Sequence, residues 1–108
     1  MGYNLNLMAQ LVVLYKTPTD AGAFEHYYRE RHIPLAWKVP KLRSYTISSG
    51  PVKAIGGDAP HLVATLTFET MQDLEAALSS VEGQAAAADL ANFATGGATL
   101  LIFENENA

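Results

Sequence analysis

The segment F-E-H-Y-Y-R-E-R-H-I-P-L, residues 24–35, carries two of the three histidines and two of the five tyrosines of the chain. In a helix, residues four apart lie on one face, so Phe24, Tyr28 and His32 are predicted to form an aromatic stripe that ends in an imidazole. Pro34 lacks a backbone N–H, and its ring crowds the carbonyl oxygen four residues earlier. We therefore expect the helix to loosen or end here, with His32 at a helix end.

The composition limits the architecture. A chain of 108 residues fits one domain of ordinary size. We expect a disordered or lead-in segment over residues 1–7, a single domain over 8–104 and a short tail over 105–108. Zero cysteines exclude disulfides, thiolate nucleophiles and zinc–thiolate sites. The apolar fraction of 49% is high for so short a chain and favours self-association.

Charge and hydropathy narrow the range of partners. The net charge of −4 argues against nucleic-acid binding, because such domains usually need a basic surface. No run approaches the roughly 20 apolar residues of a membrane span, and the first residues lack the pattern of a signal peptide. We therefore expect a cytoplasmic protein without membrane partners. His26 and His32 are six residues apart and His61 is remote, so we expect no metal site.

Residue patterns predict the order of the elements. Runs rich in apolar and β-branched residues predict strands over residues 8–16, 42–49, 61–68 and 98–104. Helical patterns, with Thr19 or Asp20 and later Thr70 as caps, predict helices over residues 21–32, 71–80 and 82–93. The last helix is nearly all alanine on its packed side, so we expect it to approach the sheet closely.

The β-α-β-β-α-β order predicts an α+β ferredoxin-like fold. Right-handed crossovers close it into a four-stranded antiparallel sheet with strand order 4-1-3-2 and the helices on one face. The other face would then expose Val12, Leu14, Leu100 and Ile102, or the residues that alternate with them. A second copy of the sheet is the simplest cover. We therefore expect a homodimer that forms a dimeric α+β barrel.

Two stretches of the chain resemble a known family. The run L-V-V-L-Y-K-T-P-T-D of residues 11–20 precedes an aromatic-rich helix, a His-x-Pro-Leu turn at His32, and a tyrosine-bearing strand. This series resembles the EthD family of the dimeric α+β barrel superfamily. Lys41 stands in the Pro40-Lys41-Leu42 corner, where glycine is common in the family. The run A-A-A-A-D-L-A-N-F of residues 85–93 fits as well, so the likeness covers essentially the whole chain.

The resemblance implies the fold and the dimer more firmly than a reaction. The family takes its name from a protein linked to ether degradation, and similar proteins include fungal polyketide decarboxylases and dehydratases. Relatives in the superfamily include lactone isomerases, quinone-forming monooxygenases and haem-binding enzymes. A fold shared by such different proteins does not define the function of one member.

Aromatic residues predict a pocket between the sheet and the helices. His32 is the candidate proton shuttle, because its unperturbed pKa of about 6.5 leaves both protonation states accessible near neutrality. Tyr28 or Tyr45 could hold an enolate or phenolate oxygen, and these three residues are the predicted catalytic set. The predicted substrate-binding residues, which suit a flat hydrophobic or aromatic molecule, are Tyr15, Phe24, Trp37, Arg43 and Phe68.

The sequence leaves the reaction open. Six of the seven basic residues lie between positions 29 and 53, and a positive field beside His32 would favour an anionic ligand. The favoured hypothesis is cofactor-free isomerisation, dehydration or decarboxylation of a small hydrophobic metabolite. One alternative is a non-catalytic binding or accessory protein of a catabolic pathway. Another is a monooxygenase-like or haem-binding protein with a single axial histidine.

Overall fold

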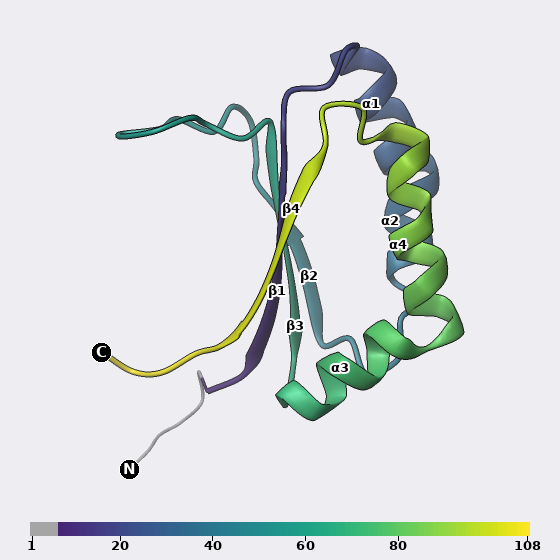
Figure 1. Ribbon diagram of the computed structural model, residues 1–108, viewed down its shortest axis with the longest axis vertical. Helices are drawn as coiled ribbons and strands as arrows, with labels where there is room; N and C mark the ends of the chain where they lie inside the picture. Colours follow the sequence, from purple (N-terminus) through teal and green to yellow (C-terminus); the bar gives the residue numbers. More distant parts are fainter. Residues whose placement is uncertain (1–6) are drawn as a thin grey trace.

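The computed structural model describes residues 7–108, so residues 1–6 of the predicted lead-in lie outside the described part. The sheet contains β1 (Ala9–Tyr15), β2 (Ser44–Ile47), β3 (Leu62–Phe68) and β4 (Ala98–Glu104). Its strand order is β2-β3-β1-β4, and every pair is antiparallel. The helices lie on one side of this sheet and leave the other side open (Figure 1). The predicted ferredoxin-like α+β fold is confirmed.

The first helical segment does not end at the proline. Asp20 caps α1 (Ala21–Tyr27) by accepting a hydrogen bond from the Ala23 N–H at 3.0 Å. The chain continues through a π-helical turn, η1 (Tyr28–His32), into α2 (Ile33–Ala36). The prediction that His32 lies at a helix end is therefore wrong, although the helix loosens where expected. The wider π turn gives the ring of Pro34 room against the preceding turn, so the helix persists past it.

The second helical segment, on the same side of the sheet, consists of α3 (Met71–Ser79) and α4 (Val81–Phe93). Thr70 caps α3 and Ser80 caps α4, each through its side-chain oxygen. In contrast to the prediction, α4 does not approach the sheet closely: it packs against α2 and α3, while α3 contacts β1 and β3. None of the helices in residues 7–108 is long and apolar enough to cross a membrane.

The strand register defines the two faces of the sheet. Leu11, Val13 and Tyr15 of β1 are buried beneath the helices. In the antiparallel register Val12 pairs with Leu101, whereas Val13 pairs with Leu100 and Leu11 with Ile102. Leu100 and Ile102 therefore lie on the helix side, and the open face carries the residues paired with Gln10, Val12 and Leu14. The predicted open-face residues Val12 and Leu14 of β1 are thus correct. In β4 the open face carries Leu101 and Phe103, the alternates of Leu100 and Ile102.

The corner before β2 keeps the conformation that a glycine would adopt. Lys41 has a φ of 68°, in the left-handed region that is rare for residues with a side chain. Two N–H to carbonyl bonds of a tight turn, from Lys38 to Leu35 at 3.2 Å and from Val39 to Ala36 at 3.1 Å, precede this corner. Lysine at this position therefore carries a backbone strain that glycine would avoid.

Gly83 allows α4 to start close to the end of α3. A Cβ built on Gly83 would overlap the carbonyl oxygen of Ala77 and would lie 3.0 Å from the Cα of Leu78. We predict that Gly83→Ala lowers the free energy of unfolding by about 1–3 kcal/mol through overpacking. Gly22→Ala in α1 is the matched control, because its Cβ would meet only Asp20 at 3.5 Å, and it should stabilise by up to about 1 kcal/mol. Urea denaturation would measure both, and stabilisation by Gly83→Ala would contradict this packing.

Candidate functional site

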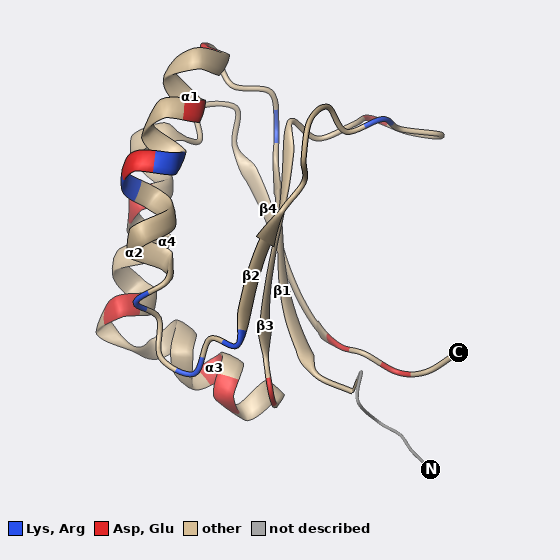
Figure 2. Ribbon diagram, turned by 180° about the vertical axis from the view of Figure 1, so that it is seen from behind, with Lys and Arg blue, Asp and Glu red and all other residues tan. Residues whose placement is uncertain are grey.

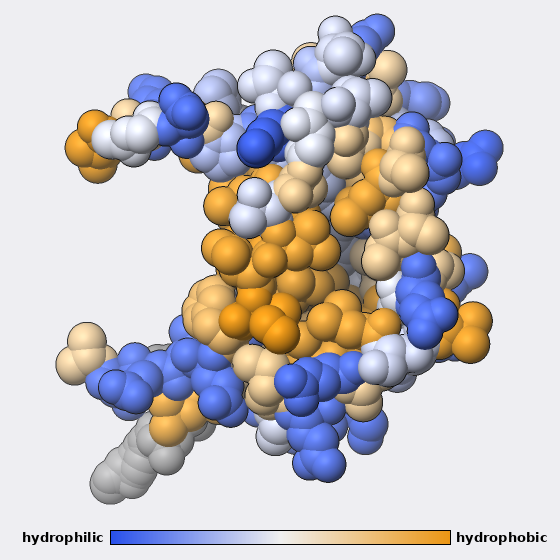
Figure 3. Space-filling view, in the orientation of Figure 1, coloured by the Kyte–Doolittle hydropathy of each residue, from blue (hydrophilic) through white to orange (hydrophobic). Residues whose placement is uncertain are grey.

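A cavity of about 60 Å³ lies between the sheet and the helices. That volume is several times what one water molecule needs. Apolar residues gather along this space (Figure 3). Its sheet wall consists of alternate residues of three strands, namely Leu11, Val13, Tyr15, Ala64, Leu66 and Phe68. Leu100 of β4 also lines it, and its side chain is 45% exposed, so this edge opens toward solvent.

The small residues of α4 explain why the cavity exists. Gly83, Ala86, Ala87 and Leu90 form the wall opposite the sheet. Because α4 packs on its neighbouring helices, these short side chains stand off the strands and leave space unfilled. The alanine pattern that predicted close approach therefore produces a cavity instead.

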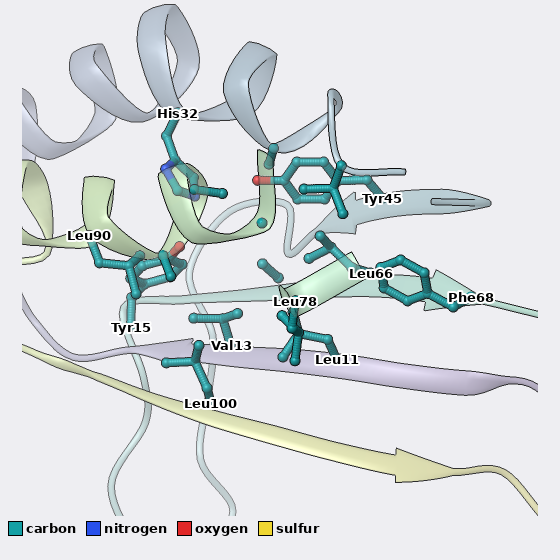
Figure 4. A pocket seen from close by; sticks show the side chains of 16 residues that line it. Leu11, Val13, Tyr15, His32, Tyr45, Leu66, Phe68, Leu78, Leu90 and Leu100 are labelled. Carbon is teal, nitrogen blue, oxygen red and sulfur yellow. The ribbon is translucent and has the colours of Figure 1, made fainter. Parts of the chain in front are cut away.

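His32 lies between two different environments. Its Nδ1 is 2.9 Å from Oδ2 of Asp89, which belongs to α4, and both side chains are more than nine-tenths buried. Its ring also lines the cavity and points into it from the π turn (Figure 4). The histidine thus joins the first helical segment to α4 and presents its other ring edge to the cavity.

The second ring nitrogen of His32 is available for chemistry. Among residues 7–108, no side chain or backbone group bonds Nε2, and no buried side-chain nitrogen or oxygen lacks a partner. Nε2 is therefore open to the cavity rather than sealed in protein. With a carboxylate accepting from Nδ1–H, the tautomer that results leaves a lone pair on Nε2. That is the arrangement of a general base.

The protonation states of this pair follow from their surroundings. Burial lowers the pKa of His32 below its usual 6.5, and the neighbouring carboxylate of Asp89 only partly opposes this. Burial raises the pKa of Asp89, but hydrogen bonds from Tyr27, Asn92 and His32 outweigh it, so the net pKa is lowered. Near neutral pH the site therefore holds a neutral imidazole bonded to an ionised carboxylate.

A second polar pair reaches the cavity from the sheet side. The hydroxyl oxygens of Tyr28 and Tyr45 are 2.6 Å apart. Tyr28 is fully buried, whereas Tyr45 lines the cavity and its hydroxyl points into the same space as the imidazole of His32 (Figure 4). Burial raises the pKa of both hydroxyls, so both remain protonated and can donate.

The structure brings some of the predicted site residues together and separates others. His32, Tyr45, Tyr15 and Phe68 line the cavity, and Tyr28 supports Tyr45 from behind. Phe24 is buried in the core, where its ring stacks on that of Tyr28 at 5.6 Å. Phe24 therefore supports the site without lining the cavity.

Two predicted ligand contacts lie at the surface. Trp37 is 49% exposed and packs beside Tyr45, with ring centroids 5.8 Å apart. Arg43 is exposed and pairs with Glu69 at 3.3 Å. The Lys and Arg residues lie on η1 and in the loops that follow β1, precede β2 and join β2 to β3 (Figure 2), and none of them lines the cavity. The charge nearest His32 is the carboxylate of Asp89, so the structure does not support a positive field beside this histidine.

Sequence reasoning missed the residues that hold His32. Asp89 accepts hydrogen bonds from the Tyr27 hydroxyl at 2.7 Å and from the Asn92 side-chain amide at 2.8 Å, besides contacting His32. Phe93 lies against the imidazole with ring centroids 4.7 Å apart. One signal was available: Asp89 is the only charged residue in the run of residues 85–93, four positions before Phe93 and so on the same helix face. Within residues 7–108, no group of three or more potential ligands could hold a metal.

The geometry thus defines a ferredoxin-like α+β domain with a helix-borne Asp–His pair facing an apolar cavity. The chain matches the EthD domain over residues 16–97, and it belongs to the EthD family. An uncharacterised 11.0 kDa protein from Rhodococcus erythropolis is 36% identical over 101 residues, which cover 92% of this chain and 96% of that protein. The crystal structure of an EthD family protein from Bacillus halodurans has 30% identity and a TM-score of 0.83, covering 93% of this chain and 100% of that one.

More distant solved structures share the fold alone. A dimeric ferredoxin-like protein of unknown function from Thermobifida fusca is 14% identical, covers 95% of both chains and has a TM-score of 0.68. A hydroxynitrile lyase from Passiflora edulis (13% identity, 95% of this chain and 97% of that one, TM-score 0.72) has the same fold. So does a cofactor-independent oxygenase from Streptomyces nogalater (13% identity, 94% and 96%, TM-score 0.65). Such a range confirms that the fold does not define the reaction.

The buried pair makes a prediction for pH dependence. We expect His32 to titrate below 6.5 in the folded protein, and Asp89→Asn to lower its pKa further by removing the charge that stabilises the imidazolium. Because the unfolded state protonates first, the free energy of unfolding should fall as pH decreases from about 6.5 toward the folded-state pKa. NMR titration of the His32 ring and denaturation at several pH values would measure both.

Tyr27→Phe is the matched control for this titration. It removes one hydrogen bond to Asp89 but keeps the carboxylate beside His32, so the pKa of His32 should change much less than in Asp89→Asn. A wild-type pKa at or above 6.5 would contradict the dominance of burial over the carboxylate, and an equal change in the two variants would contradict the pairing.

Proposed function

We propose that this protein binds a small hydrophobic or aromatic metabolite in the cavity and moves a proton on it without a cofactor. The observation that supports this most directly is the position of His32, with Nδ1 bonded to a buried carboxylate and Nε2 open to an apolar space. A neutral imidazole in such a place is a base with few competing water molecules. Isomerisation fits such a step directly. In a dehydration the same base would remove the proton and the leaving hydroxide would take it back as water, whereas in a decarboxylation His32 would protonate the enolate left after CO₂ departs.

The proposed step uses three groups of the chain. Nε2 of His32 takes a proton from a carbon next to a carbonyl group, and the carbonyl oxygen becomes an enolate oxygen. In this step the Tyr45 hydroxyl donates a hydrogen bond to that oxygen. The Tyr28 hydroxyl, whose oxygen is 2.6 Å from that of Tyr45, would then be the donor within the pair. Asp89 stabilises the imidazolium until the proton returns to the product at another atom. In an isomerisation, therefore, the proton and the electron pair are both shared only between His32 and the substrate.

Two alternatives use the same cavity differently. A non-catalytic binding protein is favoured by the composition of the lining, which is apolar except for His32 and two tyrosine hydroxyls. A haem group with His32 as axial ligand is not favoured, because no Lys or Arg of residues 7–108 lines the cavity to pair with the carboxylates of haem. We therefore keep the binding protein as the second candidate.

Hydrogen–deuterium exchange tests the proposed chemistry. The protein would be incubated in D₂O with small cyclic ketones, 1,3-diketones and phenols, and NMR would follow both deuterium uptake and the His32 ring signals. We expect His32→Ala to slow exchange by about 10²–10⁴-fold, the usual contribution of a general base. Asp89→Asn should reduce the rate less, because the imidazole remains in place.

The outcomes separate the two candidates. Exchange that depends on His32 supports proton transfer, whereas shifts of the His32 signals without exchange support the binding protein. Tyr27→Phe is the control, because it leaves both His32 and the carboxylate of Asp89 in position. Wild-type exchange at the rate of His32→Ala, together with unmoved His32 signals, would overturn both candidates for these compounds.

We also propose that two copies of the chain form a homodimer through the open face of the sheet. This face carries apolar side chains from three strands, including Val12, Leu14, Val63, Leu101 and Phe103. The last two are 45% and 42% exposed. A second sheet stacked on this face would remove them from water, as in other sheet sandwiches.

Adjacent residues of β4 offer a matched test of the dimer. Leu101 and Ile102 are equally exposed, at 45%, but lie on opposite faces of the sheet. Leu101→Glu should weaken dimerisation strongly, because it places a charge in the proposed interface without a partner. Ile102→Glu should weaken it much less. Sedimentation equilibrium would measure both, and a wild-type monomer at micromolar concentration would refute the homodimer.

A further inference from the structure

The connection between β2 and β3 is much longer than a hairpin needs. It runs from Ser48 to His61, whereas loops of β-hairpins usually contain two to five residues. We name residues 49–60 the β2–β3 arm. The arm projects away from the body on the side of the sheet opposite the helices (Figure 1). Loops of this length without secondary structure are uncommon in compact domains, where they are either functional segments or disordered linkers.

The base of the arm is held firmly, but the arm itself is not. The Ser48 N–H donates to the Val63 carbonyl at 2.8 Å, and the Val63 N–H donates to the Ser48 hydroxyl at 3.0 Å. The His61 N–H donates to the Tyr15 carbonyl at 2.7 Å. Within residues 49–60 no backbone group bonds another backbone group of the described chain. The sheet therefore fixes the direction of the arm, while the arm gains little from its own chain.

Ile55 is the residue that makes this arm unusual. Its side chain is fully exposed, whereas the other large apolar residues at the surface of residues 7–108 are between 42% and 81% exposed. Isoleucine in that position leaves its whole apolar surface in water, and the burial of this surface against another molecule would be favourable. A polar loop of the same length would serve a monomer equally well.

The arm is one of two projections that enclose the open face. The C-terminal segment after Glu104 leaves the body on the same side at the other end of the sheet (Figure 1). Apolar surface lies between these two projections in the space-filling view (Figure 3). The open face is therefore the floor of a concave apolar region with Ile55 at one rim. The apolar floor and the two projections are therefore continuous with the surface proposed above for the second sheet.

We infer that the β2–β3 arm embraces a second copy of this chain and that Ile55 packs onto the apolar surface of that copy. The inference rests on the homodimer proposed above and adds the arm to its interface. With two-fold symmetry each copy offers one arm and receives the other, so a single substitution removes two contacts per dimer. Each fully buried isoleucine accounts for at least about tenfold in affinity.

Sedimentation equilibrium of Ile55→Asp tests the inference. We expect the dissociation constant of the dimer to rise by about 100-fold, with unchanged far-ultraviolet circular dichroism because Ile55 has no contact within its own fold. Val81→Asp is the matched control: Val81 is 81% exposed and β-branched, but it begins α4 on the helix side of the sheet. This control should leave the dissociation constant unchanged.

A labelled variant gives a second measurement that does not depend on weakening the dimer. The chain has no cysteine, so Ile55→Cys can carry a single fluorophore that reports the polarity around it. Its emission should shift to longer wavelength as the protein is diluted below the dissociation constant. The same label at Val81→Cys should show no shift.

Each result has one meaning. If Ile55→Asp leaves the dissociation constant of the dimer unchanged, or if the emission of a label at position 55 does not change on dilution, the role of the arm is overturned. The homodimer itself is not affected by these two results. A wild-type protein that stays monomeric would overturn the homodimer and the arm together. The chemistry proposed for His32 is measured separately, by deuterium exchange, and survives either result.

Discussion

The hydrogen bond between His32 and Asp89 is the contact on which the site depends. It joins the π turn of the first helical segment to α4 across 2.9 Å, and both side chains are more than nine-tenths buried. Without the carboxylate the buried imidazole would lose the acceptor for Nδ1–H, and without the imidazole the carboxylate would lose one of its three donors. The helical layer and the catalytic candidate are therefore held by the same contact.

The π turn explains how one helix meets two demands. Phe24 and Tyr28 pack into the core on one face. The stripe predicted from their spacing is confirmed, because the ring centroids of Phe24 and Tyr28 are 5.6 Å apart and those of Tyr28 and His32 are 5.4 Å apart. Pro34 would break a regular helix, but the widened turn accommodates its ring. The same widening sits at the residue that faces the cavity, as π turns often do at functional sites.

The sequence contained enough to predict the fold and only half of the site. Strand alternation and the caps at Asp20 and Thr70 act locally, so they could be recognised without the structure. The partner of His32 lies 57 residues away, and a single aspartate in an alanine-rich helix usually indicates a solvent face. The distance of α4 from the sheet was equally hidden, since small residues permit either close packing or a cavity. Which of the two occurs depends on the neighbouring helices.

The two faces of the sheet serve different purposes, and the strand register keeps them apart. Along β4 the apolar run of residues 100–103 is continuous, so no periodicity separates a cavity residue from an interface residue. Pairing with β1 makes the separation: Leu100 meets Val13 beside the cavity, and Leu101 meets Val12 on the open face. A shift of one residue in this register would exchange the two roles for every side chain of the strand. The cavity and the proposed dimer interface therefore depend on one another through the pairing of β1 with β4, although no residue belongs to both.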